Sequence, residues 1–264
     1  MKSRLLVAAI GIPLILWLIL GAPLIVLELV LCLLSGIGAW ELMKCVGASK
    51  CWCLGVGGAS MLVPLIANAF GREYHVLSVM GCMVAMFTVS VWKAGTVKWQ
   101  TLATSFFAIS VIPYALCAFL RLYAAGYHRA FLLLPLIFSF ASDSGAFFVG
   151  LAFGKHKLAP KVSPKKTVEG AFGGLLGNAV GGVVFALVMN QWFGQNISYP
   201  MIALLGVICS AVAQLGDLSF SLIKREFNIK DYGTLFLAHG GVLDRFDSVI
   251  FVAPVLSSLM IALV

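Results

Sequence analysis

The sequence has few charged residues. Asp, Glu, Lys and Arg make up 11% of its 264 residues, whereas hydrophobic residues make up 61%. Soluble globular proteins carry about 25% charged residues. The shortage of charge excludes an ordinary soluble domain, a fibre and a disordered chain. It indicates an all-α, polytopic integral membrane protein.

Acidic residues are scarcer still: 10 Asp and Glu stand against 18 Lys and Arg, which gives a net charge of +8. Positive residues that flank membrane helices explain this balance better than a nucleic-acid partner does, so we expect no nucleic acid. A Walker-type glycine loop is missing, which argues against ATP hydrolysis of the transport-ATPase kind. Internal repeats, low-complexity tracts and long linkers are also missing. We therefore expect one transmembrane domain, 1–264, with an apolar scaffold part (1–129) and a catalytic part (130–264).

The seven cysteines lack the spacing of a metal site or a disulfide framework. Cys51 and Cys53 are one residue too close for a CxxC pair, and no second ligand pair follows them. We interpret the cysteines as unpaired apolar side chains. The N-terminus, with Lys2 and Arg4 before an apolar run, has features of a signal peptide. Because a second apolar run follows almost at once, an uncleaved first span is the better interpretation.

Long apolar runs dominate the rest of the chain. A helix needs about 20 apolar residues to cross the hydrocarbon core of a bilayer. Nine runs approach this length: 5–21, 23–41, 52–70, 74–92, 101–122, 130–153, 168–190, 199–223 and 247–264. Little more than Gly21-Ala22-Pro23 separates the first two, so we expect a tight helical hairpin there.

The lysines and arginines predict the orientation of these spans. If the N-terminus is cytoplasmic, fifteen of the 18 Lys and Arg residues lie on the cytoplasmic side, and only Arg72, Arg121 and Arg129 lie on the other. This asymmetry follows the positive-inside rule. We therefore expect nine spans in the cytoplasmic (inner) membrane, with the N-terminus and the active site facing the cytoplasm.

Ionisable residues inside spans are costly, by about 2.5–3.5 kcal/mol on insertion scales, and suggest function. Asp143 is the clearest case, because it lies near the middle of a span. Ser142, Ser144 and Gly145 beside it favour a polar cavity or a broken helix. An inward polar contact that holds helices together is the alternative. In the first part of the chain, Glu28 is the exception among apolar spans, and it equally fits a helix–helix contact.

A second acid, Asp217, begins a polar stripe. If its segment is helical, Asp217, Ser221, Lys224 and Arg225 lie along one face. A carboxylate, a hydroxyl and two cations in this order suit a metal–phosphate assembly. The alternative is a helix end at the membrane surface, with a local ion pair and a Lys224 side chain that extends to water.

A third polar segment precedes the last span. Gly240-Gly241 allow a close approach of the backbone, and a helix that begins near Val242 would present free amides that favour an anion. Asp244 and Asp247 follow at i, i+3, about 4.5 Å apart along the helix axis. Two such carboxylates need a cation between them, and hard divalent ions such as magnesium prefer carboxylate oxygens.

Positive donors surround these two acids in the sequence: Lys230, His239 and Arg245. The alternative interpretation is a salt-bridged cap in which Asp244 pairs with Arg245, and Asp231 pairs with Lys230.

The loop at 153–170 carries five lysines and one histidine against a single glutamate. Lys165 and Lys166 could hold phosphates as point charges, helped by a helix start near Thr167. Pro160 and Pro164 stiffen the loop. Alternatively, the loop only follows the positive-inside rule. Acids for a metal, cations for phosphates and glycines for close approach together indicate phosphoryl or nucleotidyl transfer onto a lipid.

The C-terminal motif resembles that of the phosphatidate cytidylyltransferases (CDP-diacylglycerol synthases). It spans 27 residues with the family's spacing, and its parts are Ser221, Lys224-Arg225, Lys230-Asp231, His239-Gly240-Gly241 and Asp244-Arg245-Phe246-Asp247. The segments SDSGAFFVG, FGKHKLAPKVSPKKTVEG and AQLGDL are also similar to the family. The resemblance is strong over 130–264; before that it is only hydrophobic.

The resemblance implies that CTP and phosphatidate react to give CDP-diacylglycerol and pyrophosphate, with Mg²⁺ required. Whether a second cation binds is left open. Asp217, Asp244 and Asp247 would be the metal ligands, and these acids and Lys224 the catalytic residues. The expected substrate-binding residues are Asp143, Lys165, Lys166, Ser221, Arg225, Lys230, Asp231, His239, Gly240, Gly241 and Arg245.

Two departures from the family pattern stand in the motif. Leu237-Ala238 replace a Pro-Gly pair, which affects loop stiffness, and Phe220 stands where a glutamate is common. A CTP-dependent kinase of a polyprenol or phytol is the nearest alternative function, and a transporter that uses Asp143 and Asp217 is a more distant one. The partners expected are CTP, phosphatidate and the bilayer. The apolar first part is typical of a scaffold or a subunit interface, such as that of a homodimer.

Overall fold

The computed structural model describes residues 2–71, 74–93, 97–235 and 240–263, with side chains from Gly11 onward. Across these residues the regular structure is helical apart from one two-stranded sheet. Eight helical segments of the described chain are long and apolar enough to cross a membrane. The expected all-α, polytopic membrane fold is therefore confirmed, whereas the ninth span and the orientation stay predictions.

The elements follow the predicted apolar runs closely. In chain order they are α1 (Lys2–Leu20), α2 (Leu24–Cys45), α3 (Lys50–Phe70), α4 (Tyr74–Trp92), α5 (Trp99–Leu116), α6 (Ala118–Ala124), η1 (Arg129–Leu133), α7 (Leu134–Phe153), β1 (Lys157–Ala159), β2 (Ser163–Thr167), α8 (Val168–Trp192), α9 (Tyr199–Glu226) and α10 (Leu243–Ala262). The run predicted at 247–264 begins four residues early, at Leu243, which agrees with the expected helix start near Val242.

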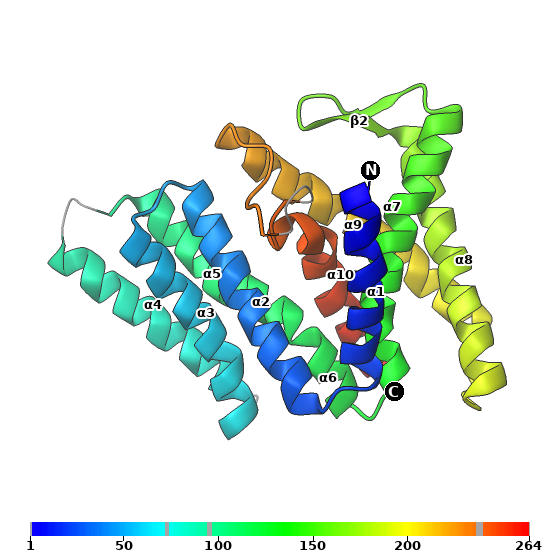
Figure 1. Cartoon of the computed structure of the whole chain (residues 1–264), viewed down its shortest axis with the longest axis horizontal. Helices are drawn as coiled ribbons and strands as arrows, with labels where there is room; N and C mark the ends of the chain where they lie inside the picture. The colour runs from blue at the N-terminus through cyan, green and yellow to red at the C-terminus, as the bar shows by residue number, and fades with distance from the viewer. Residues whose placement is uncertain (1, 72–73, 94–96, 236–239, 264) are drawn as a thin grey trace. The chain divides into compact units, whose positions relative to one another are not determined.

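The chain forms two compact units, one from residues 1–121 and 227–246 and the other from 122–226 and 247–264. In the first unit, α2 packs against α3 and α5, and α4 packs against the same two helices (Figure 1). Buried hydroxyls join these helices: Ser35 and Ser60 share a hydrogen bond of 3.1 Å, and Trp52 Nε1 donates to Ser105 Oγ at 2.8 Å. Such contacts between spans are typical of membrane bundles.

In the second unit, α7 and α8 pack closely along each other, and α9 packs against both. Glycines make this approach possible. The three atoms nearest to a Cβ added to Gly145 of α7 would all be backbone atoms of α8, among them the Gly173 carbonyl carbon at 3.1 Å and the Gly177 Cα at 3.3 Å. Small residues at such a contact let the backbones of two spans come together.

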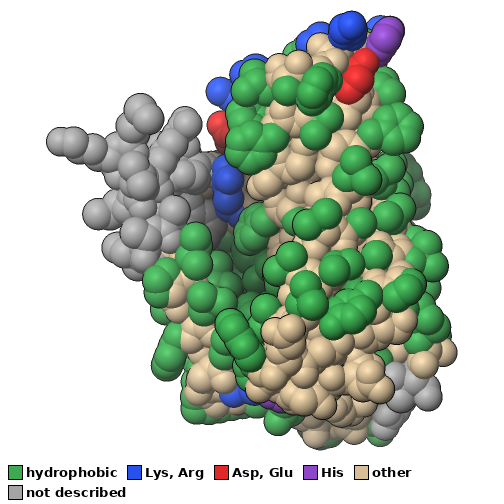
Figure 2. Space-filling model, turned by 90° about the vertical axis from the view of Figure 1, so that its right-hand side faces the viewer, with side chains coloured by type: hydrophobic (Ala, Val, Ile, Leu, Met, Phe, Trp, Pro, Cys, Tyr) green, Lys and Arg blue, Asp and Glu red, His purple; other side chains and the backbone are tan. Residues whose placement is uncertain are grey.

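The outer face of the second unit is apolar. Phe148, Leu151, Phe172, Leu176 and Val180 are all more than half exposed. Figure 2 shows hydrophobic side chains over most of this face, with most of the Lys, Arg and His side chains gathered at one end. An apolar band with charge at its end is the pattern of a surface that faces lipid.

Candidate functional site

The segment between α7 and α8, expected as a lysine-rich loop, forms an antiparallel hairpin of β1 and β2. Lys157 pairs with Thr167 and Ala159 pairs with Ser163. Thr167 then caps α8, because its hydroxyl accepts a hydrogen bond from Gly170 N at 3.2 Å. The expected helix start near Thr167 is thus present in the structure.

Glu169, in the first turn of α8, holds the base of this hairpin. Its Oε2 accepts hydrogen bonds from Lys155 N at 3.0 Å and from His156 N at 3.2 Å. Its Oε1 lies 2.6 Å from His156 Nδ1. The Glu169 carboxylate therefore fixes the direction in which the hairpin leaves the bundle.

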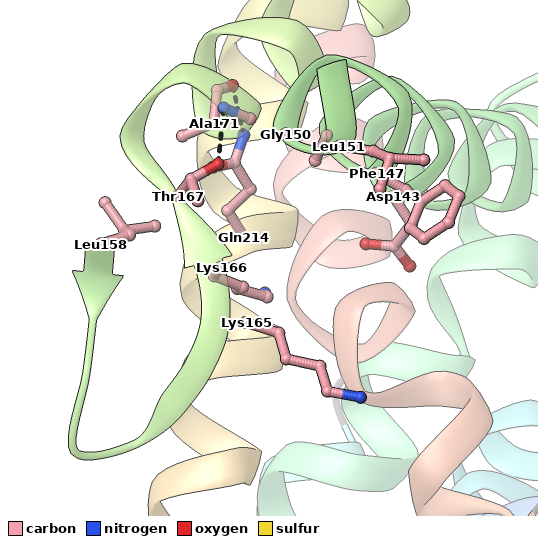
Figure 3. Close-up of a pocket in the computed structure, with 12 residues that line it drawn as sticks. Asp143, Phe147, Gly150, Leu151, Leu158, Lys165, Lys166, Thr167, Ala171 and Gln214 are labelled. Atoms are coloured by element: carbon pink, nitrogen blue, oxygen red, sulfur yellow. Dashed lines mark hydrogen bonds between the residues drawn. The ribbon is translucent and has the colours of Figure 1, made fainter. Parts of the chain in front are cut away.

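A cavity of about 380 Å³ lies beside the hairpin. Its lining residues come from α7, the hairpin, α8 and α9: Asp143, Ala146, Phe147, Gly150, Leu151, Leu158, Lys165, Lys166, Thr167, Gly170, Ala171 and Gln214. Figure 3 shows the Asp143 carboxylate and the ammonium groups of Lys165 and Lys166 directed toward the same open space. The cavity thus combines an apolar wall with charges of both signs.

Asp143 lies within an unbroken α7, so the helix is not interrupted at this acid. Asp143 lines the cavity, whose wall is mostly apolar, so the polar cavity expected around this acid stays a prediction. The neighbouring Ser142 is buried and shares a 2.8 Å hydrogen bond with Ser210 of α9. Ser142 therefore joins helices, which leaves Asp143 on the cavity side.

Asp217 of α9 forms an ion pair with Lys166 of the hairpin. Its Oδ1 also accepts a hydrogen bond from Ser221 Oγ at 3.2 Å, as expected for i, i+4 neighbours on one helical face. Farther along α9, Arg225 Nε donates to the Val162 carbonyl at 3.4 Å. The polar stripe of α9 therefore faces the hairpin, through contacts that the sequence did not predict.

Asp247 of α10 lies against α9. Gly216 lies directly against it, since a Cβ on Gly216 would be 3.0 Å from the Asp247 carbonyl oxygen. Asp217, Lys224 and Asp143 are the charged side chains that act electrostatically on the Asp247 carboxylate. Acids from α7 and α9 thus act electrostatically on the Asp247 carboxylate of α10 within the second unit.

Lys224 is buried, with 9% of its surface exposed, so it does not extend to the membrane surface as the alternative interpretation of this helix end required. Phe220, one of the departures from the family pattern, is buried in an edge-to-face contact with Phe251 at 6.2 Å between ring centroids. The glutamate that is common in the family at this position was a candidate to support the site, and in this chain a packed aromatic ring replaces it.

Asp244 belongs to the first unit, where it organises the segment before α10. Its Oδ2 accepts hydrogen bonds from Tyr232 N at 2.7 Å and from Gly241 N at 3.0 Å. Gly240 adopts a φ of 80°, in the left-handed region that favours glycine, and allows the tight turn expected there. Three further residues of the motif are exposed: Lys230, Asp231 and Arg245. His239 lies outside the described residues, as do Leu237 and Ala238.

The expectation that the first amides of α10 are free for an anion is wrong. Val242 N and Leu243 N donate to the two carboxylate oxygens of Glu41, at 3.0 and 2.9 Å. Glu41 lies on α2 and is 1% exposed, so Glu28 is not the only acid inside the spans of the first part. The sequence contains a signal for this role, because Glu41 ends a predicted span and an ionisable residue in a span suggests function, as it does for Asp143.

The donor set suits a hard cation such as Mg²⁺, which prefers carboxylate oxygens. Across residues 2–71, 74–93, 97–235 and 240–263, however, no three His, Cys, Asp or Glu side chains are grouped closely enough to hold a metal ion. In this structure the Lys166 ammonium provides the positive charge beside Asp217. The three-carboxylate metal site stays a prediction.

Comparison with known proteins gives a match along the whole chain. The sequence model described as "Cytidylyltransferase family" matches residues 2–263. A phosphatidate cytidylyltransferase of Staphylococcus epidermidis is 30% identical over 207 residues, 78% of each chain. Those of Haemophilus influenzae and Bacillus subtilis are 46% identical over 132 residues (50% of this chain, 46% of the relative) and 41% identical over 134 residues (51% and 48%).

Proposed function

The chain belongs to the cytidylyltransferase family, and from this premise we infer that it transfers the cytidylyl group of CTP to phosphatidate. An oxygen of the phosphatidate phosphate attacks the α-phosphorus of CTP. The new P–O bond forms while the bond to the bridging oxygen of the β-phosphate breaks. The products are CDP-diacylglycerol, a precursor of phospholipids, and pyrophosphate. The match over residues 2–263, with relatives named for this activity, carries the inference.

The cavity beside the hairpin is the proposed place of reaction. Lys165 and Lys166 balance the negative charge of the phosphates there, as lysines do in many phosphate sites. Phe147 and Leu151 of α7 line the same cavity and are exposed on the apolar face of the unit. A lipid can therefore present its phosphate to the lysines while its acyl chains remain in the bilayer.

Asp217, Asp244 and Asp247 are the proposed ligands of Mg²⁺, and Asp143 helps to organise the cavity or a second cation. When bound, the metal would neutralise charge on the triphosphate and the leaving pyrophosphate. Support comes from the charges of Asp217 and Asp143, which act electrostatically on the Asp247 carboxylate. Lys224, a buried charge that acts on Asp247, offsets the charge of this acid and that of the leaving group.

The remaining motif residues have supporting roles in this proposal. Ser221 orients Asp217, with which it shares a hydrogen bond. Gly240 and Gly241 shape the turn before α10. Substrate contacts are assigned to the polar and charged side chains that remain: Arg225, Lys230, Asp231, His239 and Arg245.

We further propose nine spans with a cytoplasmic N-terminus, so that CTP reaches the site from the cytoplasm. The five lysines of 155–166 lie at one end of the second unit, whereas the loop between α8 and α9 has none, which supports this orientation. A homodimer stays a proposal for the apolar surface of the chain.

The reaction is tested with purified protein in detergent, phosphatidate and Mg²⁺, using CTP labelled on either the α- or the γ-phosphate. Cytidylyl transfer puts the α-label into the lipid and the γ-label into pyrophosphate. A CTP-dependent lipid kinase does the reverse and puts the γ-label into the lipid. Lipid labelled only from the γ-phosphate, or no labelled lipid, would reject the proposal.

The assigned acids are tested by Asp217→Asn and Asp247→Asn, each of which we expect to abolish transfer in a folded protein. Glu226→Gln is the matched control, because Glu226 is an exposed acid at the end of the same α9. Full activity in either Asp variant would remove that residue from the site.

A further inference from the structure

Glu41 is a buried carboxylate for which the proposed reaction has no use. It lies in α2 with 1% of its surface exposed, 201 residues before its nearest hydrogen-bond donor in the chain, Val242. A charge buried in a span is costly unless it is hydrogen-bonded. Its carboxylate must therefore be accounted for by what it contacts.

Both carboxylate oxygens bind the start of α10. Oε1 accepts a hydrogen bond from Val242 N at 3.0 Å, and Oε2 accepts one from Leu243 N at 2.9 Å. A carboxylate at this position interacts favourably with the positive end of the helix dipole, and hydrogen bonds to a charged acceptor are stronger than neutral ones. Glu41 thus caps α10 from another helix.

Two glycines keep the space for this carboxylate. A Cβ on Gly241 would collide with both Glu41 oxygens, and a Cβ on Gly233 would collide with Oε1. A Cβ on Gly233 would also lie 3.2 Å from the Gly241 Cα. The segments before α10 therefore fold around the Glu41 side chain.

Asp244 holds the same turn from the other side. Its Oδ2 accepts a hydrogen bond from Gly241 N, the amide next to the two that Glu41 binds. Three consecutive amides, at residues 241–243, are thus divided between Asp244 and Glu41. A change at Glu41 is transmitted to the Asp244 carboxylate along the consecutive peptide groups of 241–243, of which Glu41 binds two amides and Asp244 binds the third.

We propose that Glu41 is a positioning residue that fixes the first turn of α10 and so sets the direction of the Asp244 carboxylate. It acts through Asp244 and does not touch the substrate, since its two oxygens are bound to Val242 and Leu243 and its side chain is buried. The inference rests on the proposed function to the extent that Asp244 is a ligand of Mg²⁺ in the transfer reaction.

The test uses the full chain in detergent and the variant Glu41→Gln. An amide keeps the shape of the side chain but offers one acceptor oxygen for two donors. Loss of a group that orients a metal ligand typically lowers metal affinity or activity by about 10–100-fold. We expect a decrease in kcat of this size, together with a higher Mg²⁺ concentration at half-maximal activity.

Glu28→Gln is the matched control, because Glu28 is the other acid of α2. We expect its kcat and Mg²⁺ dependence to equal those of the wild type. A Glu41→Gln protein with wild-type kcat and Mg²⁺ dependence would overturn the inference, even if its thermal stability were lower. If Glu41→Gln does not fold, Glu41→Asp, which keeps the charge, is measured in its place with the same two outcomes.

Hydrogen–deuterium exchange of the peptide that covers 240–246 gives a readout that does not depend on activity. In the wild type the amides of Val242 and Leu243 should exchange slowly, and Glu41→Gln should speed their exchange whereas Glu28→Gln should not. Equal exchange in the wild type and Glu41→Gln would overturn the positioning role. A wild type that exchanges as expected but makes no labelled lipid would reject the transfer reaction alone.

Discussion

Gly145→Ala tests the close packing of α7 and α8, from which the cavity is built. The added Cβ would lie 3.1 Å from the Gly173 carbonyl carbon, 3.3 Å from the Gly177 Cα and closer still to the Gly173 carbonyl oxygen. Ordinary contacts of a Cβ lie at 3.4–4 Å. Because all three neighbours are backbone atoms, no side chain can rotate away, and α7 must move relative to α8.

Overpacking of this kind costs about 1–3 kcal/mol of stability. The movement also displaces Asp143 and Ala146, which lie within two residues of Gly145 and line the cavity, so cytidylyl transfer should fall together with stability. Gly58→Ala is the control, because a Cβ there would have no atom within 4 Å. It should be neutral or stabilise α3 by up to about 1 kcal/mol, the helix-propensity difference between Gly and Ala.

The assay is the free energy of unfolding in mixed micelles titrated with SDS, measured for the wild type and both variants. The expected order of stability is Gly58→Ala equal to or above the wild type, and Gly145→Ala below it. A Gly145→Ala protein as stable and as active as the wild type would refute the packing of α7 on α8 described above.

Three further predictions concern the hairpin and the orientation. Thr167→Ala removes the hydroxyl that caps α8 and should lower the free energy of unfolding by about 1 kcal/mol. Thr167→Ser keeps the hydroxyl and should be as stable as the wild type. Equal stability of the two variants would contradict the cap. Glu169→Gln loosens the base of the hairpin, so trypsin should cleave this variant after the lysines of 155–166 faster than it cleaves the control Glu226→Gln. Equal cleavage rates would show that the Glu169 contacts do not order the hairpin. In a Cys51→Ser background, a membrane-impermeant maleimide added to intact cells should label Asn196→Cys but not Lys161→Cys; the reverse result would invert the proposed topology.

The sequence predicted the spans well because lipid imposes a simple length rule on apolar helices. For example, the run predicted at 74–92 coincides with α4, Tyr74–Trp92. The hairpin of β1 and β2 was missed, since its order depends on Glu169 and on contacts with α9 that no local pattern contains. Similarly, the stripe on α9 predicted which side chains share a face, but not that Lys166 would pair with Asp217.

Glu41 is an example of a contact that a single sequence does not predict. The pattern around Val242 indicated a helix start with free amides, and the start is where it was expected. The amides are bound by a residue about 200 positions earlier in the chain. Only the three-dimensional structure joins such distant segments, and an isolated acid at the end of an apolar run gives no indication of its partner.

The central claim is that acids of α9 and α10 bind the metal on which cytidylyl transfer depends. The most direct measurement is transfer of the α-label from CTP to phosphatidate after treatment with EDTA and during a Mg²⁺ titration, for the wild type and Asp247→Asn. The wild type should be inactive after EDTA treatment and recover as Mg²⁺ is added, while Asp247→Asn should remain inactive throughout. Full transfer in EDTA, or recovery of Asp247→Asn at the Mg²⁺ concentrations that restore the wild type, would contradict the account.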